Sequence, residues 1–285
     1  MKKQNLLILL SKQSSLKYYK SIQQKPCEKR IYNLKINRIN IDKLNISDFN
    51  KLNNKKTTTI ILPKKVDLRS KFQPVFDQGN IGSCTANAFC GLIGYLEPLM
   101  IVSRLFLYYN ERDTDDNTTI DTDTDSGAYL SDGIVSLQKY GICQELDWPY
   151  ILEKFDDKPN DDCYKYASKH TITQVENINN DIFQMKNSLA NGNPFVVGIA
   201  IYSSFQSVKT KKTGIIPMPN VKDIFLGGHA VVCVGFDDSK QVWIMRNSWG
   251  SNWGDKGYFY LPYLYLLSPL LSTEIWCIKK MTSIQ

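Results

Sequence analysis

A cysteine stands where a glycine-containing loop gives way to the clearest helical pattern in the chain. The loop covers residues 78–83, and Cys84 opens a run of apolar residues at helical spacing that Pro98 stops. A thiol in the first turn of a helix lies in the positive field of the helix dipole, which stabilises the thiolate and lowers the pKa below about 8.5. Cys84 is therefore a candidate nucleophile, although a cysteine at such a position is commonly only a small buried hydrophobe.

The partners that a thiolate needs are also present. His229 enters a strand-like run directly after two glycines, and Asn247 begins the segment Asn-Ser-Trp-Gly. An imidazolium beside the sulfur would lower the thiol pKa further, and an asparagine oxygen could orient the imidazole. The side-chain amide of Gln78 and the backbone N–H of Cys84 could both point at a developing oxyanion, where one donor contributes about 3 to 4 kcal/mol.

Other chemistries find little support. The chain has only two histidines and no H-E-x-x-H, C-x-x-C, G-x-S-x-G or P-loop motif, so we expect neither a metal site nor a cofactor. His170 has no motif around it, which favours a surface or strand-edge role. The acidic stretch 113–125 imitates a calcium loop, but Ser126 stands where glycine is required and Asp132 where glutamate is usual. A solvated acidic loop is the favoured interpretation.

Three helices and five strands should position these residues. Helical spacing is found from residue 84 to 97, from 128 to 139 and from 181 to 191, and Gly141 suits a helix C-terminal cap. β-Branched runs cover 195–202, 229–237, 242–246, 258–261 and 273–278. Helices first and strands afterwards predict an α+β layout with two subregions and a cleft between them.

The composition is that of a globular protein, and the charge is unevenly distributed along the chain. Of 285 residues, 42% are hydrophobic and 22% charged, which is typical of a globular protein and excludes wholesale disorder. No apolar run reaches the about 18 residues that a membrane span needs. The net charge of +7 is uneven, because residues 1–65 carry 16 basic and 3 acidic side chains (+13) and the remaining 220 residues carry −6. A basic leader thus precedes a mildly acidic body, and opposite charges favour docking of the two.

These motifs resemble those of the papain-like cysteine peptidases, the cathepsin family. Five segments match in order, from Leu62 to about Ile278, and the 145 residues from Cys84 to His229 suit the family. The matching segments are Pro63 with Val66–Arg69 at the mature start, Gln78–Cys84 at the nucleophile, Tyr140–Ile142 with Trp148–Tyr150, Gly228–Gly235 at the histidine, and Asn247–Gly254 with Gly257 and Tyr258.

The resemblance implies a papain-like two-lobed α+β fold, with a helical left lobe, a β-barrel-like right lobe and the active-site cleft between them. It implies a cysteine endopeptidase made as a zymogen, with Cys84, His229, Asn247 and Gln78 as catalytic residues. Gly127, Ala128 and Gly228 would bind the substrate backbone, and Trp249 would shield the bond between Asn247 and His229. Residues 1–65 would be a propeptide acting as an intramolecular inhibitor, cut between Thr59 and Val66, and 66–285 the peptidase domain, with polypeptides as substrates and a monomeric state.

The sequence also departs from the family. Ile81 replaces the disulfide-forming cysteine common three residues before the nucleophile, and Thr85 and Asn87 replace aromatic residues common after it. Cys143 with Cys163 is the only disulfide pairing we consider, and Cys90 is expected in the core. Glu274 could reach the pocket for the second residue before the cut.

Two alternatives and the location stay open. The leader could instead be a basic tail that binds nucleic acid or an anionic surface, although nucleic acid is not the favoured partner, and a thiol acyl-enzyme could be resolved by amines as a transferase. Apolar residues 6–10 imitate a signal peptide but fall short of its hydrophobic length. The family implies a lysosomal, endosomal or secreted location; cytoplasmic or viral-particle locations remain compatible with the sequence.

Overall fold

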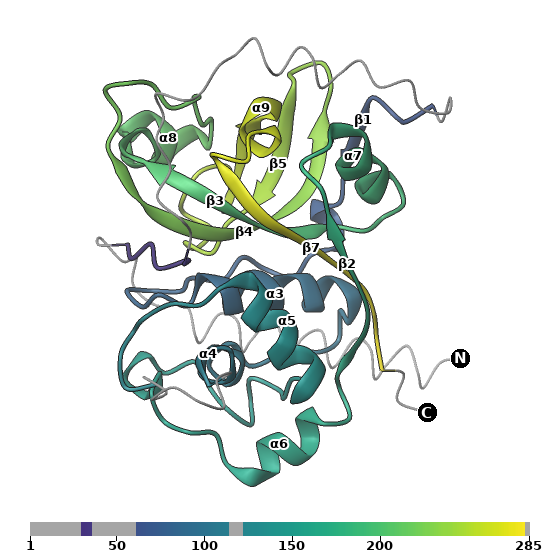
Figure 1. Cartoon of the computed structure of the whole chain (residues 1–285), viewed down its shortest axis with the longest axis vertical. Helices are drawn as coiled ribbons and strands as arrows, with labels where there is room; N and C mark the ends of the chain where they lie inside the picture. Colours follow the sequence, from purple (N-terminus) through teal and green to yellow (C-terminus); the bar gives the residue numbers. More distant parts are fainter. Residues whose placement is uncertain (1–29, 36–60, 114–121, 283–285) are drawn as a thin grey trace.

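The computed structural model describes residues 30–35, 61–113 and 122–282, and these form two lobes (Figure 1). The lower lobe in Figure 1 is helical, and the upper lobe is built on an antiparallel sheet. The α+β layout predicted from the sequence is confirmed. Predictions that concern residues 1–29 and 36–60, including the signal peptide, lie outside the described residues.

The helical lobe gathers around the helix that begins at Cys84. Its core is formed by apolar residues of α3, α4 and α5, with one face against the sheet lobe. Pro98 follows the end of α3 by two residues, as the sequence predicts. The helices of this lobe are α3 (Cys84–Leu96), α4 (Arg104–Arg112), α5 (Leu130–Lys139) and α6 (Asp161–Ala167), with the 3-10 turn η3 (Leu152–Lys154).

The second lobe is a seven-stranded antiparallel sheet in the order β2-β7-β3-β4-β5-β6, with β1 paired to β4. The central strand β3 is buried over its whole length, as its unbroken apolar sequence requires. The strands are β1 (Lys65–Asp67), β2 (Ile172–Ile178), β3 (Phe195–Tyr202), β4 (Phe225–Asp237), β5 (Val242–Arg246), β6 (Tyr258–Pro262) and β7 (Ser272–Met281).

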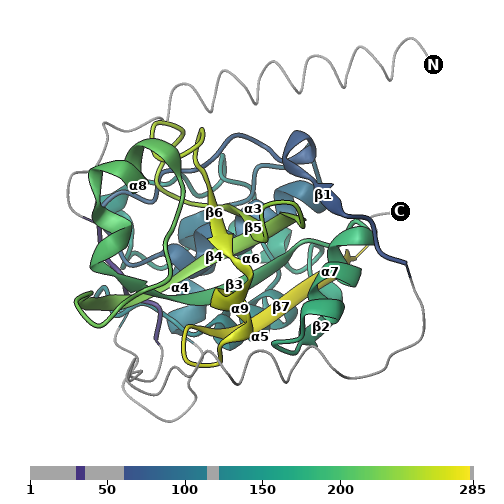
Figure 2. The same cartoon turned by 90° about the horizontal axis from the view of Figure 1, so that it is seen from above.

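Short helices flank this sheet. Figure 2 shows α8 at one side of it and α7 at the other. The apolar residues of this lobe form a second core, which includes the fully buried Trp243 and Tyr265. The helical segments here are η2 (Arg69–Lys71), α7 (Ile182–Ala190), η4 (Ser203–Gln206), α8 (Val208–Thr213) and α9 (Tyr263–Leu267). Within the described ranges, no helix has both the length and the apolar character needed to cross a membrane.

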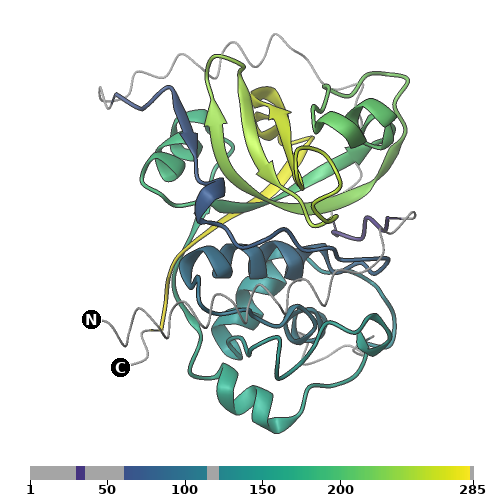
Figure 3. The ribbon, with the colours of Figure 1, turned by 180° about the vertical axis from the view of Figure 1, so that it is seen from behind.

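The segment 30–35 of the leader lies at the boundary between the lobes. It is the purple stretch in Figures 1 and 3, which view the molecule from opposite sides. Asn33 and Leu34 form isolated β-bridges with Gly228 of β4. The leader thus touches the strand that carries His229.

Candidate active site

Cys84 occupies the first turn of α3, at the contact between the lobes. Its side chain is fully buried. The backbone N–H groups of Ala230, Thr85 and Cys84 itself lie close enough to the sulfur to favour the thiolate, and so they oppose the effect of burial on the thiol pKa. Because Ala230 directly follows His229 in β4, the thiol lies against the strand position that supplies the imidazole.

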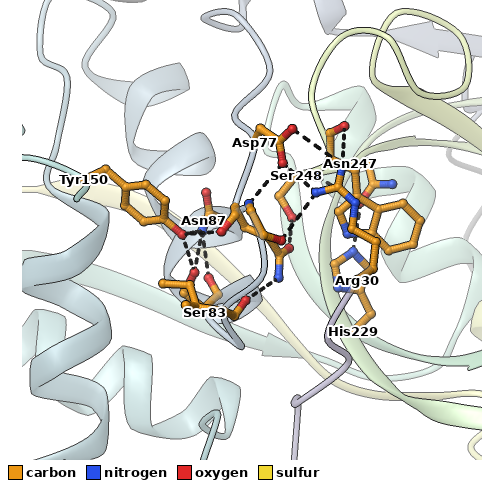
Figure 4. Close-up of polar contacts among 12 residues, drawn as sticks. Arg30, Asp77, Ser83, Asn87, Tyr150, His229, Asn247 and Ser248 are labelled. Atoms are coloured by element: carbon orange, nitrogen blue, oxygen red, sulfur yellow. Dashed lines mark hydrogen bonds and ion pairs between the residues drawn. The ribbon is translucent and has the colours of Figure 1, made fainter. Parts of the chain in front are cut away.

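His229 has the tautomer that a proton acceptor needs. Its Nε2 lies 2.8 Å from Asn247 Oδ1, and since an amide oxygen only accepts, Nε2 carries the proton (Figure 4). In the neutral ring Nδ1 then bears the lone pair, and Nδ1 is buried without a hydrogen-bond partner. The Trp249 ring stacks on the imidazole, with centroids 4.7 Å apart and planes at 26°, and so shields this pair from water.

Gln78 is fixed by both lobes. Ser248 donates its hydroxyl to Gln78 Oε1 at 2.6 Å, and Gln78 Nε2 donates to the Ile81 carbonyl at 3.1 Å. The backbone N–H of Gln78 donates to the Ser248 carbonyl at 2.9 Å. The amide orientation is therefore set by the residue that follows Asn247.

A polar cluster behind the nucleophile loop holds Ser83 in place. The hydroxyls of Ser83 and Tyr150 are 2.6 Å apart, and Asn87 Nδ2 donates to the Ser83 carbonyl at 2.9 Å (Figure 4). Tyr150 also donates to the Gln78 carbonyl at 2.9 Å. Asn87 thus stabilises the loop that precedes Cys84.

Arg30 and Tyr32 of the leader cover the imidazole. The Arg30 guanidinium forms an ion pair with Asp77 at 2.5 Å and donates to the Trp249 carbonyl at 3.2 Å (Figure 4). The Tyr32 ring packs edge-on against the rings of His229 and Trp249, with centroid-to-centroid distances of 6.3 Å and 5.8 Å. The leader therefore occupies the space above the candidate catalytic histidine.

Residues 34 and 35 of the leader form backbone hydrogen bonds with both lobes. The N–H of Leu34 donates to the Gly228 carbonyl at 3.2 Å, and that of Lys35 donates to the Ala128 carbonyl at 3.3 Å. Gly127 has φ +68°, and a Cβ there would lie 1.8 Å from the Asn33 carbonyl oxygen. Only glycine combines this backbone conformation with so close an approach.

Burial keeps the thiol and the imidazole uncharged. It raises the pKa of the Cys84 thiol to about 12. Burial also lowers the pKa of His229 to about 4; the bond to Asn247 opposes this effect and the nearby Arg30 charge adds to it. With the leader in place, the pair is therefore thiol and imidazole rather than thiolate and imidazolium.

Several details differ from the sequence predictions. Asp125 is not merely a solvated residue, because its carboxylate accepts from the Gly82 N–H at 2.8 Å and from the Tyr108 hydroxyl, so it anchors the nucleophile loop. His170 is buried and stacks on Tyr166, with ring centroids 4.2 Å apart, so the surface role is wrong; it lies two residues before the edge strand β2, as the strand-edge alternative expects.

The cysteines and acidic residues singled out in the sequence have the following surroundings. Cys143 and Cys163 are free thiols joined by a side-chain hydrogen bond, so the disulfide we considered is not formed here, whereas Cys90 is buried as expected. Glu274 accepts from the Ser131 N–H at 2.7 Å. Among the described residues, no group of three histidine, cysteine or acidic side chains is arranged to hold a metal ion.

Two buried polar contacts near the nucleophile were not predicted. Arg104 and Glu145, almost without exposure, form an ion pair beneath the Tyr150 ring. Glu111 of α4 reaches the first turn of α3 and accepts from the Thr85 hydroxyl. Each contact joins residues 26 to 41 positions apart, and no local pattern in the sequence signals it.

The chain matches known proteins over most of its length. A family model described as papain family cysteine protease matches residues 62–263. An uncharacterised peptidase C1-like protein of Acanthamoeba polyphaga mimivirus is 38% identical over 220 residues, which are 72% of this chain and 70% of that protein. Cysteine proteinase 1 of Entamoeba histolytica is 30% identical over 206 residues, 69% of this chain and 62% of that one.

Solved structures share the fold. The crystal structure of xylellain, a cysteine protease from Xylella fastidiosa, is 35% identical, has a TM-score of 0.71, and the match covers 90% of this chain and 98% of that one. Procathepsin L 3 of Tenebrio molitor is 18% identical with a TM-score of 0.60, covering 96% and 88%, a likeness of fold alone.

Proposed function

Because the chain belongs to the papain family of cysteine proteases, we propose that it is an endopeptidase made as a zymogen, with Cys84 as nucleophile and His229 as general base and acid. The observation that carries this proposal is that the Cys84 sulfur lies near the backbone N–H of Ala230, the residue after His229, while the Nδ1 lone pair of the His229 ring is unused. A thiol and an imidazole in this relation form the ion pair that attacks acyl groups.

The proposed reaction uses the tautomer fixed by Asn247. When the cleft is open to substrate, Nδ1 of His229 takes the thiol proton, and the thiolate attacks the peptide carbonyl carbon. The C–N bond then breaks as the imidazolium returns the proton to the leaving amine, which leaves an acyl-enzyme. Water, deprotonated by the same imidazole, hydrolyses the thioester and regenerates the thiol. Asn247 Oδ1 holds Nε2–H throughout, so the ring stays aligned.

The oxyanion would be held by Gln78 and the backbone N–H of Cys84. Nε2 of Gln78 carries two N–H groups, and the one bonded to the Ile81 carbonyl leaves the other for the substrate oxygen. Because Ser248 fixes Oε1, this donor is oriented before substrate arrives. Gly127, Ala128 and Gly228 would bind the substrate backbone where they now bind residues 33–35 of the leader.

The leader would act as an intramolecular inhibitor. Arg30 and Tyr32 cover the imidazole, and the resulting burial disfavours the charged form of the pair. The ion pair between Arg30 and Asp77 also supports docking on the body over a nucleic-acid role for this arginine. We place the domain boundary at residues 65 and 66 and the processing site between Thr59 and Val66; β1, which begins at Lys65, pairs with β4.

A single substitution tests the proposal. Cys84→Ala should abolish peptide cleavage and leave the leader attached, whereas Cys90→Ala, a control at a buried cysteine of the same helix, should retain both cleavage and processing. Mass spectrometry of a peptide library and of the chain itself measures both outcomes. Undiminished cleavage by the Cys84 variant would refute the assignment, and products carrying an added amine instead of water would indicate a transferase.

A further inference from the structure

A carboxyl group is buried directly behind the candidate nucleophile. Glu111 of α4 is 1% exposed. It accepts a hydrogen bond from the Thr85 hydroxyl, and the backbone N–H of Ala86 lies near enough to favour its ionised form. Both donors belong to the first turn of α3, the turn that begins with Cys84.

This helix end lacks its usual cap. Ser83 precedes the helix but makes no capping bond, because its hydroxyl contacts Tyr150 and Asn87 instead. Two acidic side chains therefore share this helix end: the backbone N–H of Thr85 lies near the Cys84 sulfur and that of Ala86 near the Glu111 carboxyl, where each favours the ionised form. A thiolate and a carboxylate at one helix N-terminus would compete for the same positive field.

Among the residues that the structure describes, none forms an ion pair with the Glu111 carboxylate. Glu111 Oε2 is buried without a hydrogen-bond partner. The charged groups that face Glu111 are Arg112 of its own helix and Asp132 of α5. The Arg112 guanidinium donates to the carbonyls of residues 122, 124 and 155 rather than to Glu111.

The surroundings favour the protonated acid. Burial raises the pKa of Glu111 to about 8, the nearby Asp132 adds to the rise, and the Thr85 bond opposes it. The charge of an ionised Glu111 raises the pKa of the Cys84 thiol and of the Cys90 thiol as well. Two acids that influence each other in this way titrate as a pair.

We propose that Glu111 is a positioning residue for the nucleophile: while its carboxyl is protonated, the α3 N-terminus stabilises the Cys84 thiolate, and when it ionises, the thiolate is disfavoured. The proposal rests on Cys84 being the nucleophile. It adds a residue from a third element, α4, to a site otherwise built by α3 and the sheet. The direction follows from charge alone, since a second anion at the same helix end repels the first.

The test compares alkylation of Cys84 by iodoacetamide in the full chain with and without Glu111→Gln, from pH 5 to pH 10. Glutamine keeps the shape and the acceptor for Thr85 but cannot ionise. Opening of the leader affects both proteins equally, so the ratio of their rate constants reports the thiolate alone. We expect a ratio near one below pH 6, where Glu111 is protonated. The ratio should rise by up to about tenfold as Glu111 ionises, which corresponds to one pKa unit, and return toward one when the pH exceeds the thiol pKa of both proteins.

A second variant keeps the test decisive if Glu111→Gln folds poorly. Thr85→Val removes only the hydroxyl that stabilises ionised Glu111, so the pKa of Glu111 should rise. The pH at which ionised Glu111 begins to slow alkylation should therefore move upward. Glu153→Gln, at an exposed glutamate on η3, serves as the charge-matched control and should give a ratio of one throughout. A ratio for Glu111→Gln that stays constant with pH, or an unmoved midpoint in the Thr85 variant, overturns the proposal.

Failure of this inference is separable from failure of the proposed function. Alkylation is mapped to Cys84 by peptide mass and needs no peptidase activity. If Cys84→Ala still cleaves peptides, the function is wrong. If Cys84→Ala is inactive but the ratio is flat with pH, only the role of Glu111 is wrong.

Discussion

Arg30→Ala should release the leader from the site. The Arg30 and Asp77 side chains are 12% and 14% exposed, so their 2.5 Å ion pair is largely shielded from solvent. Arg30 also donates to the Trp249 carbonyl at 3.2 Å. Truncating one partner of such a pair costs about 2 to 5 kcal/mol, and we take the lower part, about 2 to 3 kcal/mol, because the pair keeps some exposure. The open fraction should then rise by about 30- to 150-fold.

Alkylation of Cys84 measures this opening. The sulfur is fully buried while the leader is docked, so the alkylation rate is proportional to the open fraction when reclosing is faster than alkylation. Intact mass verifies that the leader remains attached during the measurement. Lys35→Ala is the matched control, since that exposed side chain makes no ion pair among the described residues.

A change of charge must be separated from a change of contact. Loss of Arg30 also removes a charge that lowers the pKa of His229, which alone would raise reactivity. Arg30→Lys keeps the charge but loses the planar guanidinium, which donates several hydrogen bonds at once. Its alkylation rate should therefore lie between those of the unchanged chain and Arg30→Ala. An increase below about threefold for Arg30→Ala, or an equal increase for Lys35→Ala, would refute the reasoning.

The remaining predictions concern the site itself. Asn247→Ala should lower kcat/KM by about 10- to 30-fold, the equivalent of one hydrogen bond of about 1.5 to 2 kcal/mol to the imidazole; steady-state peptide hydrolysis measures it, and an unchanged value would contradict the orienting role. Gln78→Ala should lower kcat by about 10²- to 10³-fold, and unchanged turnover would assign the oxyanion to the backbone alone. Gly127→Ala should weaken leader docking and raise KM, because it adds a Cβ 1.8 Å from Asn33 O; Gly192→Ala, with φ +76° but only the Tyr95 hydroxyl at 3.6 Å, is the control and should do neither. Acid should promote leader release. The pKa of His229 is about 4 with the leader docked and 6.5 for a solvated imidazole, so the open state binds more protons between these two values. The docked state is therefore destabilised as the pH falls from about 6.5 to 4. The alkylation rate, corrected for the pH dependence of the exposed thiol, should rise as the pH falls through this range, and a rate that does not rise would contradict the prediction.

The sequence predicted the sheet better than the helical lobe. The bounds of strands 195–202 and 242–246 were predicted to the residue, because a β-branched run favours a strand and the polar residues on either side mark its ends. Helix α4 was missed because its buried face carries charge. Arg104 pairs with Glu145, and Glu111 accepts from the Thr85 hydroxyl of α3, whereas a hydrophobic pattern treats charged residues as exposed. A buried charge is satisfied by a partner distant in sequence, and one chain alone does not reveal that partner.

The residues of the candidate site were predicted by type and spacing, but the contacts that hold them in place were not. Cys84, His229 and Asn247 stand in recognisable segments. Asp125 holds the nucleophile loop from a stretch that sequence composition assigns to solvent, and Arg30 reaches Asp77 across 47 positions. These contacts depend on how the lobes and the leader meet, which no local periodicity encodes.

The cover over the sulfur has a consequence beyond blocking substrates. Peroxides and other oxidants attack the thiolate far faster than the thiol, and they must reach it. In the closed chain the sulfur is both protonated and fully enclosed. If the leader acts as the proposed inhibitor, the closed chain would also be protected from oxidation at Cys84, and this protection would end when the leader is removed.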